Sequence, residues 1–166
     1  MSTALIIVDI QNDYFPNGKM ELSKPELAAA NAAKVLDWFR KNTKDSVYHV
    51  QHIASDPALG FFLPDTTGAE IRKTVLPLEN ETVVTKSFAN SFLETGLESK
   101  LRENGVTKVV IIGMMTHMCI DATVRAAVDL DLETVLIEDA CATRDLSYGN
   151  KTVPAEQALY AFVSAL

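Results

Sequence analysis

The chain has 166 residues, a formal net charge of −7, 48% hydrophobic residues and 22% charged residues. These values are typical of one globular domain, which we expect to span residues 1–166. The acidic balance argues against nucleic-acid or membrane partners, because both favour basic surfaces. No apolar run is long enough to span a bilayer and no basic leader opens the sequence, so we expect a cytoplasmic protein. The two cysteines lie far apart in the sequence and form no C-x-x-C pattern, which is consistent with the reducing conditions of the cytoplasm.

Short apolar runs alternate along the chain with longer amphipathic segments. The runs are rich in Val, Ile and Leu, and three are nearly continuous, which is typical of strands buried on both faces of a parallel sheet. The predicted strands are Ala4–Ile10, Ser46–His52, Thr82–Thr85, Lys108–Gly113 and Glu133–Glu138.

Helix signals lie between these strands. The capping-box pattern S-K-P-E opens a helix that ends near Arg40, and T-G-L-E opens another that Gly105 ends. We expect two more helices, from Cys119 to about Leu130 and from Pro154 onward. Alternation of strand and helix predicts a three-layer α/β/α sandwich with a doubly wound parallel sheet. The irregular stretch Ala54–Glu81 is either a binding loop or lid, or a surface excursion with one short helix.

Three chemically active side chains stand where predicted strands end. Asp9 follows the first strand, Lys86 follows the third, and Cys119 opens the helix after the fourth. Ligands of open parallel sheets bind beyond the carboxyl ends of the strands, so we expect an acid, an amine and a thiol to meet at one edge. Taken alone, each also has a structural explanation as a turn residue, a solvated lysine or a small buried hydrophobe.

Together the three form a coherent set for nucleophilic catalysis. A helix N-terminus and a nearby ammonium both favour the thiolate of Cys119, and a carboxylate can take the thiol proton and return it to a leaving group. Backbone N–H groups in the loop before Cys119 are suited to hold a developing oxyanion. Cys141, in "EDACATRD", lacks this context, and we expect it to be structural.

Other common chemistries lack their motifs here. The turn after the first strand has no glycine before Gly18, Gln11 stands where a two-aspartate phosphatase has its second acid, and no G-x-x-x-x-G-K loop exists. His49 and His52 lie three residues apart on one strand, so their side chains face opposite sides and cannot share an ion, and His117 is isolated. We therefore expect neither a metal nor an organic cofactor.

With Asp9, Lys86 and Cys119 in view, the sequence resembles the isochorismatase-like cysteine hydrolases, which include nicotinamidases, N-carbamoylsarcosine amidases and isochorismatases. The motifs that carry the resemblance are "LIIVDIQNDYF", the lysine of "TKSFANSF", "GMMTHMCIDATVRAA" and "IEDACATRD". The resemblance covers nearly the whole chain. It implies a six-stranded parallel sheet of order 3-2-1-4-5-6 and a catalytic triad of Asp9, Lys86 and Cys119. It also implies a cis peptide bond at Met114–Met115, with the N–H groups of Met115 and Cys119 as the oxyanion hole.

The chain departs from the family pattern at three points. Metal-dependent nicotinamidases carry Asp-x-His after the second strand, whereas this chain has "QHIASDP". The Thr116–His117 pair stands where nicotinamidases tend to have an acid. The chain ends at Leu166 on the last expected helix, so either the sheet lacks its sixth strand or the sequence continues beyond this point.

These observations predict a cysteine-dependent hydrolase of a small amide, imide or related C–N bond, acting through a thioester. The alternatives are isochorismatase-type cleavage of a vinyl ether, a catalytically silent binding module on the same fold and, last, a thiol redox protein. We expect a small-molecule substrate and a homodimer or homotetramer. The expected substrate-binding residues are Gln11, Tyr14, Phe88, Phe92, His117 and Met118, with Phe61 or Phe62 from the long loop.

Overall fold

The computed structural model describes residues 2–43 and 46–166. The five predicted strands form one parallel sheet in the order β3-β2-β1-β4-β5, which is the order that the family resemblance implied for these strands. None of the described helices combines the length and apolarity that crossing a lipid bilayer requires. The strands are β1 (Ser2–Val8), β2 (Val47–His52), β3 (Thr82–Lys86), β4 (Val106–Met114) and β5 (Glu133–Ala142).

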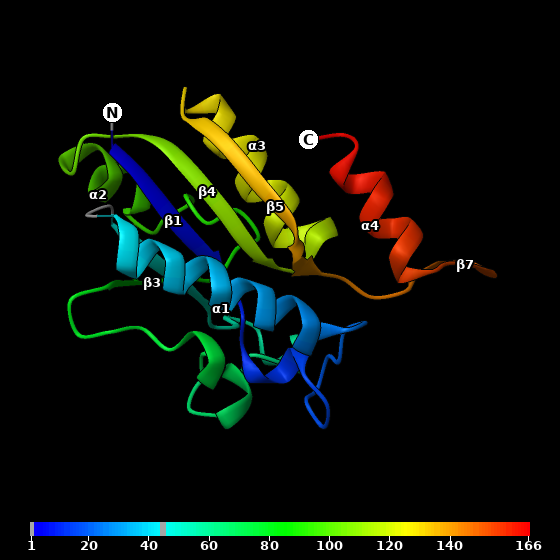
Figure 1. Ribbon diagram of the computed structural model, residues 1–166. Helices are drawn as coiled ribbons and strands as arrows, with labels where there is room; N and C mark the ends of the chain where they lie inside the picture. The colour runs from blue at the N-terminus through cyan, green and yellow to red at the C-terminus, as the bar shows by residue number, and fades with distance from the viewer. Residues whose placement is uncertain (1, 44–45) are drawn as a thin grey trace.

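Helices cover both faces of the sheet and give the predicted three layers (Figure 1). One apolar core lies between the sheet and α1, and a second core on the opposite face includes side chains of α2 and α3. The central strands β1 and β4 are almost fully buried, whereas β5 is partly exposed because it lies at an edge. The helices are α1 (Pro25–Asn42), α2 (Leu97–Glu103), α3 (Asp121–Asp129) and α4 (Ala155–Val163).

Both predicted capping boxes are wrong. Before α1, Lys24 is the N-cap residue in a left-handed conformation, and the Ser23 N–H donates to the Thr143 carbonyl instead of starting a helix. Before α2, Gly96 is the N-cap residue, and Thr95 Oγ1 accepts the Leu97 N–H just inside the helix. Proline at the first position of α1 and a backbone bond to another segment override the local sequence pattern.

Three local features of the C-terminal half were not predicted from the sequence. The segment Thr116–Ile120 is a π-helical turn that runs into α3, so Cys119 lies within a helical turn and not at the start of a helix after a loop. Strand β5 extends to Ala142, and the short antiparallel strands β6 (Leu146–Tyr148) and β7 (Lys151–Val153) follow it. Among the described residues, no sixth strand joins the parallel sheet.

The long irregular segment lies against the carboxyl ends of β1 and β2. It contains three short 3₁₀ turns and not one helix. A backbone hydrogen bond from the Arg72 N–H to the Ile10 carbonyl holds it against the chain after β1, and another from the Ala54 N–H to the Phe62 carbonyl closes it internally. This placement agrees with a loop at the binding edge and not with a remote surface excursion. The turns are Pro57–Leu59, Thr67–Ala69 and Lys73–Val75.

Gly113 lets β4 pass very close to β1 at the edge where Asp9 and Met114 follow. Its φ of +136° lies in a region that is essentially restricted to glycine, and a Cβ there would collide with the Val8 carbonyl oxygen. The register between β4 and β5 also shifts between Ile111 and Gly113. The glycine therefore sets where the chain leaves the sheet toward Cys119.

Replacing Gly113 with alanine should lower the free energy of unfolding by about 3 kcal/mol, because left-handed strain and a backbone collision act together. Urea denaturation measures this loss. The matched control is Gly149→Ala, since Gly149 has φ of +60° but open space around its Cβ position. That variant should lose only about 1 kcal/mol. Equal losses in the two variants would contradict the close-approach argument.

Glu81 ties the end of the long segment to α1 and β2. Its carboxylate accepts hydrogen bonds from Arg40 at 2.7 Å and lies 2.9 Å from His49 Nε2 and 2.9 Å from the Leu78 N–H. Burial alone raises the pKa of Glu81, but the hydrogen bonds from Arg40, Leu78 and His49 outweigh it and lower the pKa to about 2. The charged carboxylate is therefore the form that holds these three segments together.

The lowered pKa makes part of the stability dependent on pH. An unfolded-state pKa near 4.5 and a folded-state pKa near 2 mean that the Glu81 contribution is complete above pH 4.5 and is lost as the pH falls toward 2. Glu81→Gln should therefore destabilise the protein at pH 7 and lose less stability than the parent between pH 5 and pH 2. Urea titrations at several pH values test this, with the surface variant Glu98→Gln expected to follow the parent.

Candidate active site

The fold brings Asp9, Lys86 and Cys119 together in a buried cluster. Lys86 Nζ lies 2.7 Å from Asp9 Oδ2 and 3.2 Å from Cys119 Sγ. The three residues are only 0%, 2% and 5% exposed, respectively. The sequence predicted this meeting from strand ends alone, and the structure places all three side chains in contact through the lysine.

The backbone holds Asp9 in an uncommon conformation. Its φ of 52° lies in the left-handed region, which a non-glycine residue adopts at a cost of about 1–2 kcal/mol. The N–H of Asp9 donates to the Val50 carbonyl of β2, and its carbonyl accepts the Gln11 N–H. These two bonds turn the chain sharply at the end of β1 and direct the carboxylate toward Lys86.

Lys86 lies on a strand and Cys119 in a helical turn, and the segments that follow them are tied together. Lys86 is the last residue of β3, and the segment after it is fixed to α3 because Ser91 Oγ lies 2.8 Å from Thr123 Oγ1 in a buried contact. Cys119 lies in the π-helical turn, where the Met115 carbonyl accepts the N–H groups of Met118 and Ile120. The Met114–Met115 peptide bond is cis, as the resemblance implied.

The ammonium of Lys86 donates to three acceptors. Its hydrogen-bond partners are His52 Nδ1 at 3.0 Å, the Phe88 carbonyl at 3.0 Å and Cys119 Sγ at 3.2 Å. The Asp9 carboxylate forms a buried ion pair with the same ammonium, with Oδ2 2.7 Å from Nζ. Burial lowers the pKa of Lys86, but the interactions with Asp9 and Cys119 raise it by a larger amount, so the net shift is upward.

The structure reverses the expected effect on the thiol. Burial is the largest influence and raises the pKa of Cys119; the Asp9 carboxylate raises it further, and Lys86 offsets only part of the rise. The resting sulfur is therefore a protonated thiol beside a carboxylate, and not the thiolate that the helix-terminus argument predicted. Burial likewise raises the pKa of Cys141 to about 12, and its thiol donates to the Ile137 carbonyl, consistent with the expected structural role.

A histidine that the sequence left unassigned completes the cluster. His52 Nδ1 lies 3.9 Å from Asp9 Oδ2, and ligand-type atoms of Asp9, His52 and Cys119 all lie within 4.8 Å of one another. Such an O, N and S set has the chemistry of a zinc site. Lys86 Nζ is within 3.2 Å of an atom of each residue, so the ammonium fills the position that a metal would need. His49, by contrast, faces Glu81, which confirms that the two histidines point to opposite sides.

Aromatic side chains cover the cluster. The Tyr14 ring packs edge-on to Phe62 at 4.6 Å, Phe61 packs on Phe62 at 4.9 Å, and Phe62 lies 5.8 Å from the His52 ring. Burial raises the pKa of Tyr14 well above its usual value, and electrostatic interactions with Cys119 and Asp9 add to the rise. The Tyr14 phenol is therefore neutral and lies close to the thiol and the carboxylate.

Other predicted substrate contacts have different surroundings. The Gln11 side chain donates to the carbonyls of His52 and Ala69, and its Oε1 accepts the His52 N–H. His117 Nδ1 lies 2.6 Å from Thr143 Oγ1, on the side that faces α4. Phe88 and Met118 are 44% and 45% exposed, whereas Phe92 packs against the core that contains Cys119.

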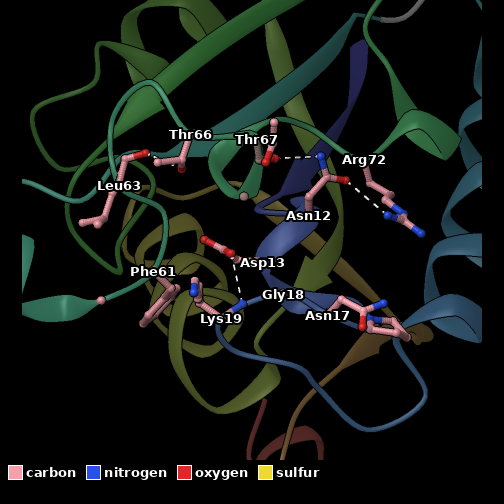
Figure 2. Close-up of a pocket in the computed structure, with 13 residues that line it drawn as sticks. Asn12, Asp13, Asn17, Gly18, Lys19, Phe61, Leu63, Thr66, Thr67 and Arg72 are labelled. Atoms are coloured by element: carbon pink, nitrogen blue, oxygen red, sulfur yellow. Dashed lines mark hydrogen bonds between the residues drawn. The ribbon is translucent and has the colours of Figure 1, made fainter.

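Asp13 fixes the loops beside the aromatic cover. Its Oδ1 accepts the Lys19 N–H at 3.1 Å, its Oδ2 accepts the Phe62 N–H at 2.7 Å, and Gly68 packs so closely that a Cβ would collide with the carboxylate. Figure 2 shows Asp13 at the wall of a cavity of about 400 Å³, whose lining comes from two segments, between residues 12 and 19 and between residues 60 and 72. The lining of this cavity includes none of Asp9, Lys86 and Cys119.

Removing the Asp13 carboxylate should destabilise this part of the molecule. Asp13→Ala leaves the buried N–H of Phe62 and the partly buried N–H of Lys19 without acceptors, at a cost of about 2–4 kcal/mol. Urea unfolding measures the cost, and faster limited proteolysis within residues 54–81 locates it. The exposed variant Asp37→Ala, which loses only a surface ion pair with Lys41, should cost less than about 1 kcal/mol. Similar costs for both would refute the role given to Asp13.

Comparisons with known proteins agree with this architecture. The isochorismatase domain family matches residues 3–156. The uncharacterized isochorismatase family protein YddQ of Bacillus subtilis (strain 168) is 56% identical over 166 residues, which cover 100% of this chain and 92% of that protein. A putative isochorismatase hydrolase from Oleispira antarctica has a similar crystal structure, with a TM-score of 0.94, 47% identity and coverage of 99% of this chain and 88% of that one.

A more distant structure is that of an N-carbamoylsarcosine amidase from Thermoplasma acidophilum, with a TM-score of 0.79, 27% identity and coverage of 87% of this chain and 86% of that one. The shared fold and the family matches define a hydrolase with a doubly wound α/β sheet. More narrowly, the chain belongs to the isochorismatase family of hydrolases. The resemblance read from the sequence motifs is thus confirmed.

Proposed function

We propose that the protein hydrolyses a small amide, imide or related C–N bond, with Cys119 as the nucleophile. The observation that carries the proposal is the buried contact of one ammonium with both a carboxylate and a thiol, at 2.7 Å and 3.2 Å. A thiol beside a carboxylate with free oxygen lone pairs is suited to proton transfer before nucleophilic attack. The similar structure named as an N-carbamoylsarcosine amidase supports C–N chemistry on this fold.

The first half of the reaction forms a thioester. Asp9 takes the proton from Cys119 Sγ, and the sulfur forms a bond to the substrate carbonyl carbon while the carbonyl electron pair moves to oxygen. The N–H groups of Met115 and Cys119 stabilise this oxyanion. When the carbonyl re-forms, the C–N bond breaks, and the departing nitrogen takes the proton from Asp9.

The second half releases the product. Asp9 takes a proton from water, the hydroxide oxygen bonds to the thioester carbon, and the C–S bond breaks as the carbonyl re-forms. The proton held by Asp9 returns to the sulfur, so each cycle consumes one water and yields one acid and one amine. Lys86 stays charged throughout and stabilises the negative charge as it moves between carboxylate and sulfur.

The surroundings favour a flat, partly apolar substrate. The Tyr14 phenol and the Phe61 and Phe62 rings form an apolar wall beside the cluster, and the neutral phenol supplies one hydrogen-bond donor. A small planar amide or imide matches a wall of this kind. We expect the wall to set the size limit of the substrate.

Replacing Cys119 with alanine should abolish turnover while the unfolding midpoint stays within a few degrees of the parent, because one sulfur is removed from a buried site. A panel of small amides and imides, with isochorismate beside them, is assayed for amine or acid release. Hydrolysis of a panel amide at the parent rate by Cys119→Ala would refute the nucleophile.

The same panel separates the alternatives. Selective turnover of isochorismate, retained in Cys119→Ala, would instead indicate vinyl ether cleavage. Cys141→Ala is the matched control, because Cys141 is also buried and its thiol donates to the Ile137 carbonyl, away from Asp9 and Lys86. It should keep the parent rate within about threefold. Absence of hydrolysis across the whole panel, with Cys119 no more reactive than Cys141, would favour a silent binding module.

A further inference from the structure

The antiparallel strands β6 and β7 form a hairpin that stands out from the body of the protein (Figure 1). Every residue from 147 to 154 is exposed, and the Tyr148 side chain at the end of β6 is 93% exposed. Gly149 and Asn150 connect the strands, and the φ of +60° at Gly149 is typical of a tight two-residue hairpin turn. A two-stranded hairpin is only marginally stable alone, so this one gains stability from a further surface on which it can pack.

The two faces of the hairpin differ in polarity. Side chains alternate between the faces along each strand. One face carries the hydroxyl groups of Ser147 and Thr152, whose oxygens are 2.9 Å apart and hydrogen-bonded to each other. The opposite face is apolar except for one ammonium, and it remains uncovered in the single chain. It consists of two cross-strand pairs, Leu146 with Val153 and Tyr148 with Lys151.

Both ends of the hairpin continue into residues that line a groove of about 260 Å³ between α1 and α4. Thr143 lies just before β6 and Ala155 just after β7, and both belong to the wall of this groove. The lining also includes two large exposed side chains, Leu27 of α1 at 60% and Tyr160 of α4 at 62%. Large apolar side chains gathered in one exposed groove are typical of a surface that another molecule covers.

The charge of the groove is complementary to that of the hairpin. Three carboxylates line the groove, from Glu138, Asp139 and Glu156, whereas Lys24 is the one cation of its described lining. The net negative charge favours a partner that brings a cation together with an apolar group. At the tip of the hairpin, the cross-strand pair of Tyr148 and Lys151 offers this combination.

A second copy of the chain carries both surfaces. Within one chain Tyr148 does not enter the groove, since it is almost fully exposed and is not part of the lining. Because the hairpin adjoins its own groove, a two-fold axis between them places each hairpin on the groove of the opposite copy. Two equivalent contacts then form at once, as in other two-fold interfaces.

We propose that the protein forms a two-fold dimer in which the Tyr148–Lys151 tip of each hairpin inserts between α1 and α4 of the other copy. The Tyr148 ring packs on the apolar side chains of the groove, and the Lys151 ammonium faces its carboxylates. This dimer is independent of the chemistry proposed for Cys119.

Sedimentation velocity over a wide range of protein concentration measures the association. Tyr148→Asp removes the aromatic anchor and Leu27→Arg blocks the groove, so each should raise the dissociation constant at least about thirtyfold. Trp38→Ala is the matched control, because Trp38 is 56% exposed on α1 but lies outside this groove. It should stay within about threefold of the parent. Urea unfolding checks that the three variants are folded, as expected for exposed side chains.

Mixing two variants separates this arrangement from other dimers. The intact hairpin of Leu27→Arg can enter the intact groove of Tyr148→Asp, so an equimolar mixture should associate at concentrations where each variant alone is dissociated. An interface between two hairpins or between two grooves gives no such recovery. A monomeric parent, a mixture without recovery, or dissociation caused by Trp38→Ala and not by Tyr148→Asp would overturn the proposal.

Discussion

The structure of the site depends on a single buried cation. Lys86 is 2% exposed, and an ammonium so far from water costs several kcal/mol unless charge and hydrogen bonds compensate it. Asp9 supplies the charge, and His52, Phe88 and Cys119 supply the three acceptors. Each partner comes from a different part of the chain, so the burial of this one group links the ends of β1, β2, β3 and β4.

The same burial governs the chemistry of the sulfur. An ammonium at 3.2 Å normally favours a thiolate, but the loss of water and the adjacent carboxylate outweigh it and raise the pKa of Cys119. A thiol that keeps its proton until a base removes it is protected from oxidation at rest, since the thiolate is the reactive form. The Asp9 carboxylate lies beside this thiol, because its charge and its hydrogen bond raise the pKa of Cys119, and we propose it as the base that removes the proton.

The strand patterns predicted the sheet and the meeting of Asp9, Lys86 and Cys119, because parallel strands must present their carboxyl ends at one edge. The protonation state of Cys119 was not predictable, since it depends on burial and on distances across the sheet. The spacing of the two histidines predicted that His52 faces away from His49. Its contact with Lys86 was not predictable, because it depends on the register between β2 and β3, which the spacing along one strand does not encode. The π-helical turn around Cys119 likewise has no signature in its residue types.

The donor set also explains why an ammonium suits this position. Asp9, His52 and Cys119 offer the oxygen, nitrogen and sulfur that a zinc ion prefers, but a bound metal would hold all three ligands deprotonated and fixed. An ammonium binds them through directed N–H groups that can be redistributed as charge moves. In the proposed reaction the sulfur gives up a proton, forms a bond to carbon and regains the proton, while the cation remains in place. The proposed cycle between thiol and thioester would gain from a cation of this kind.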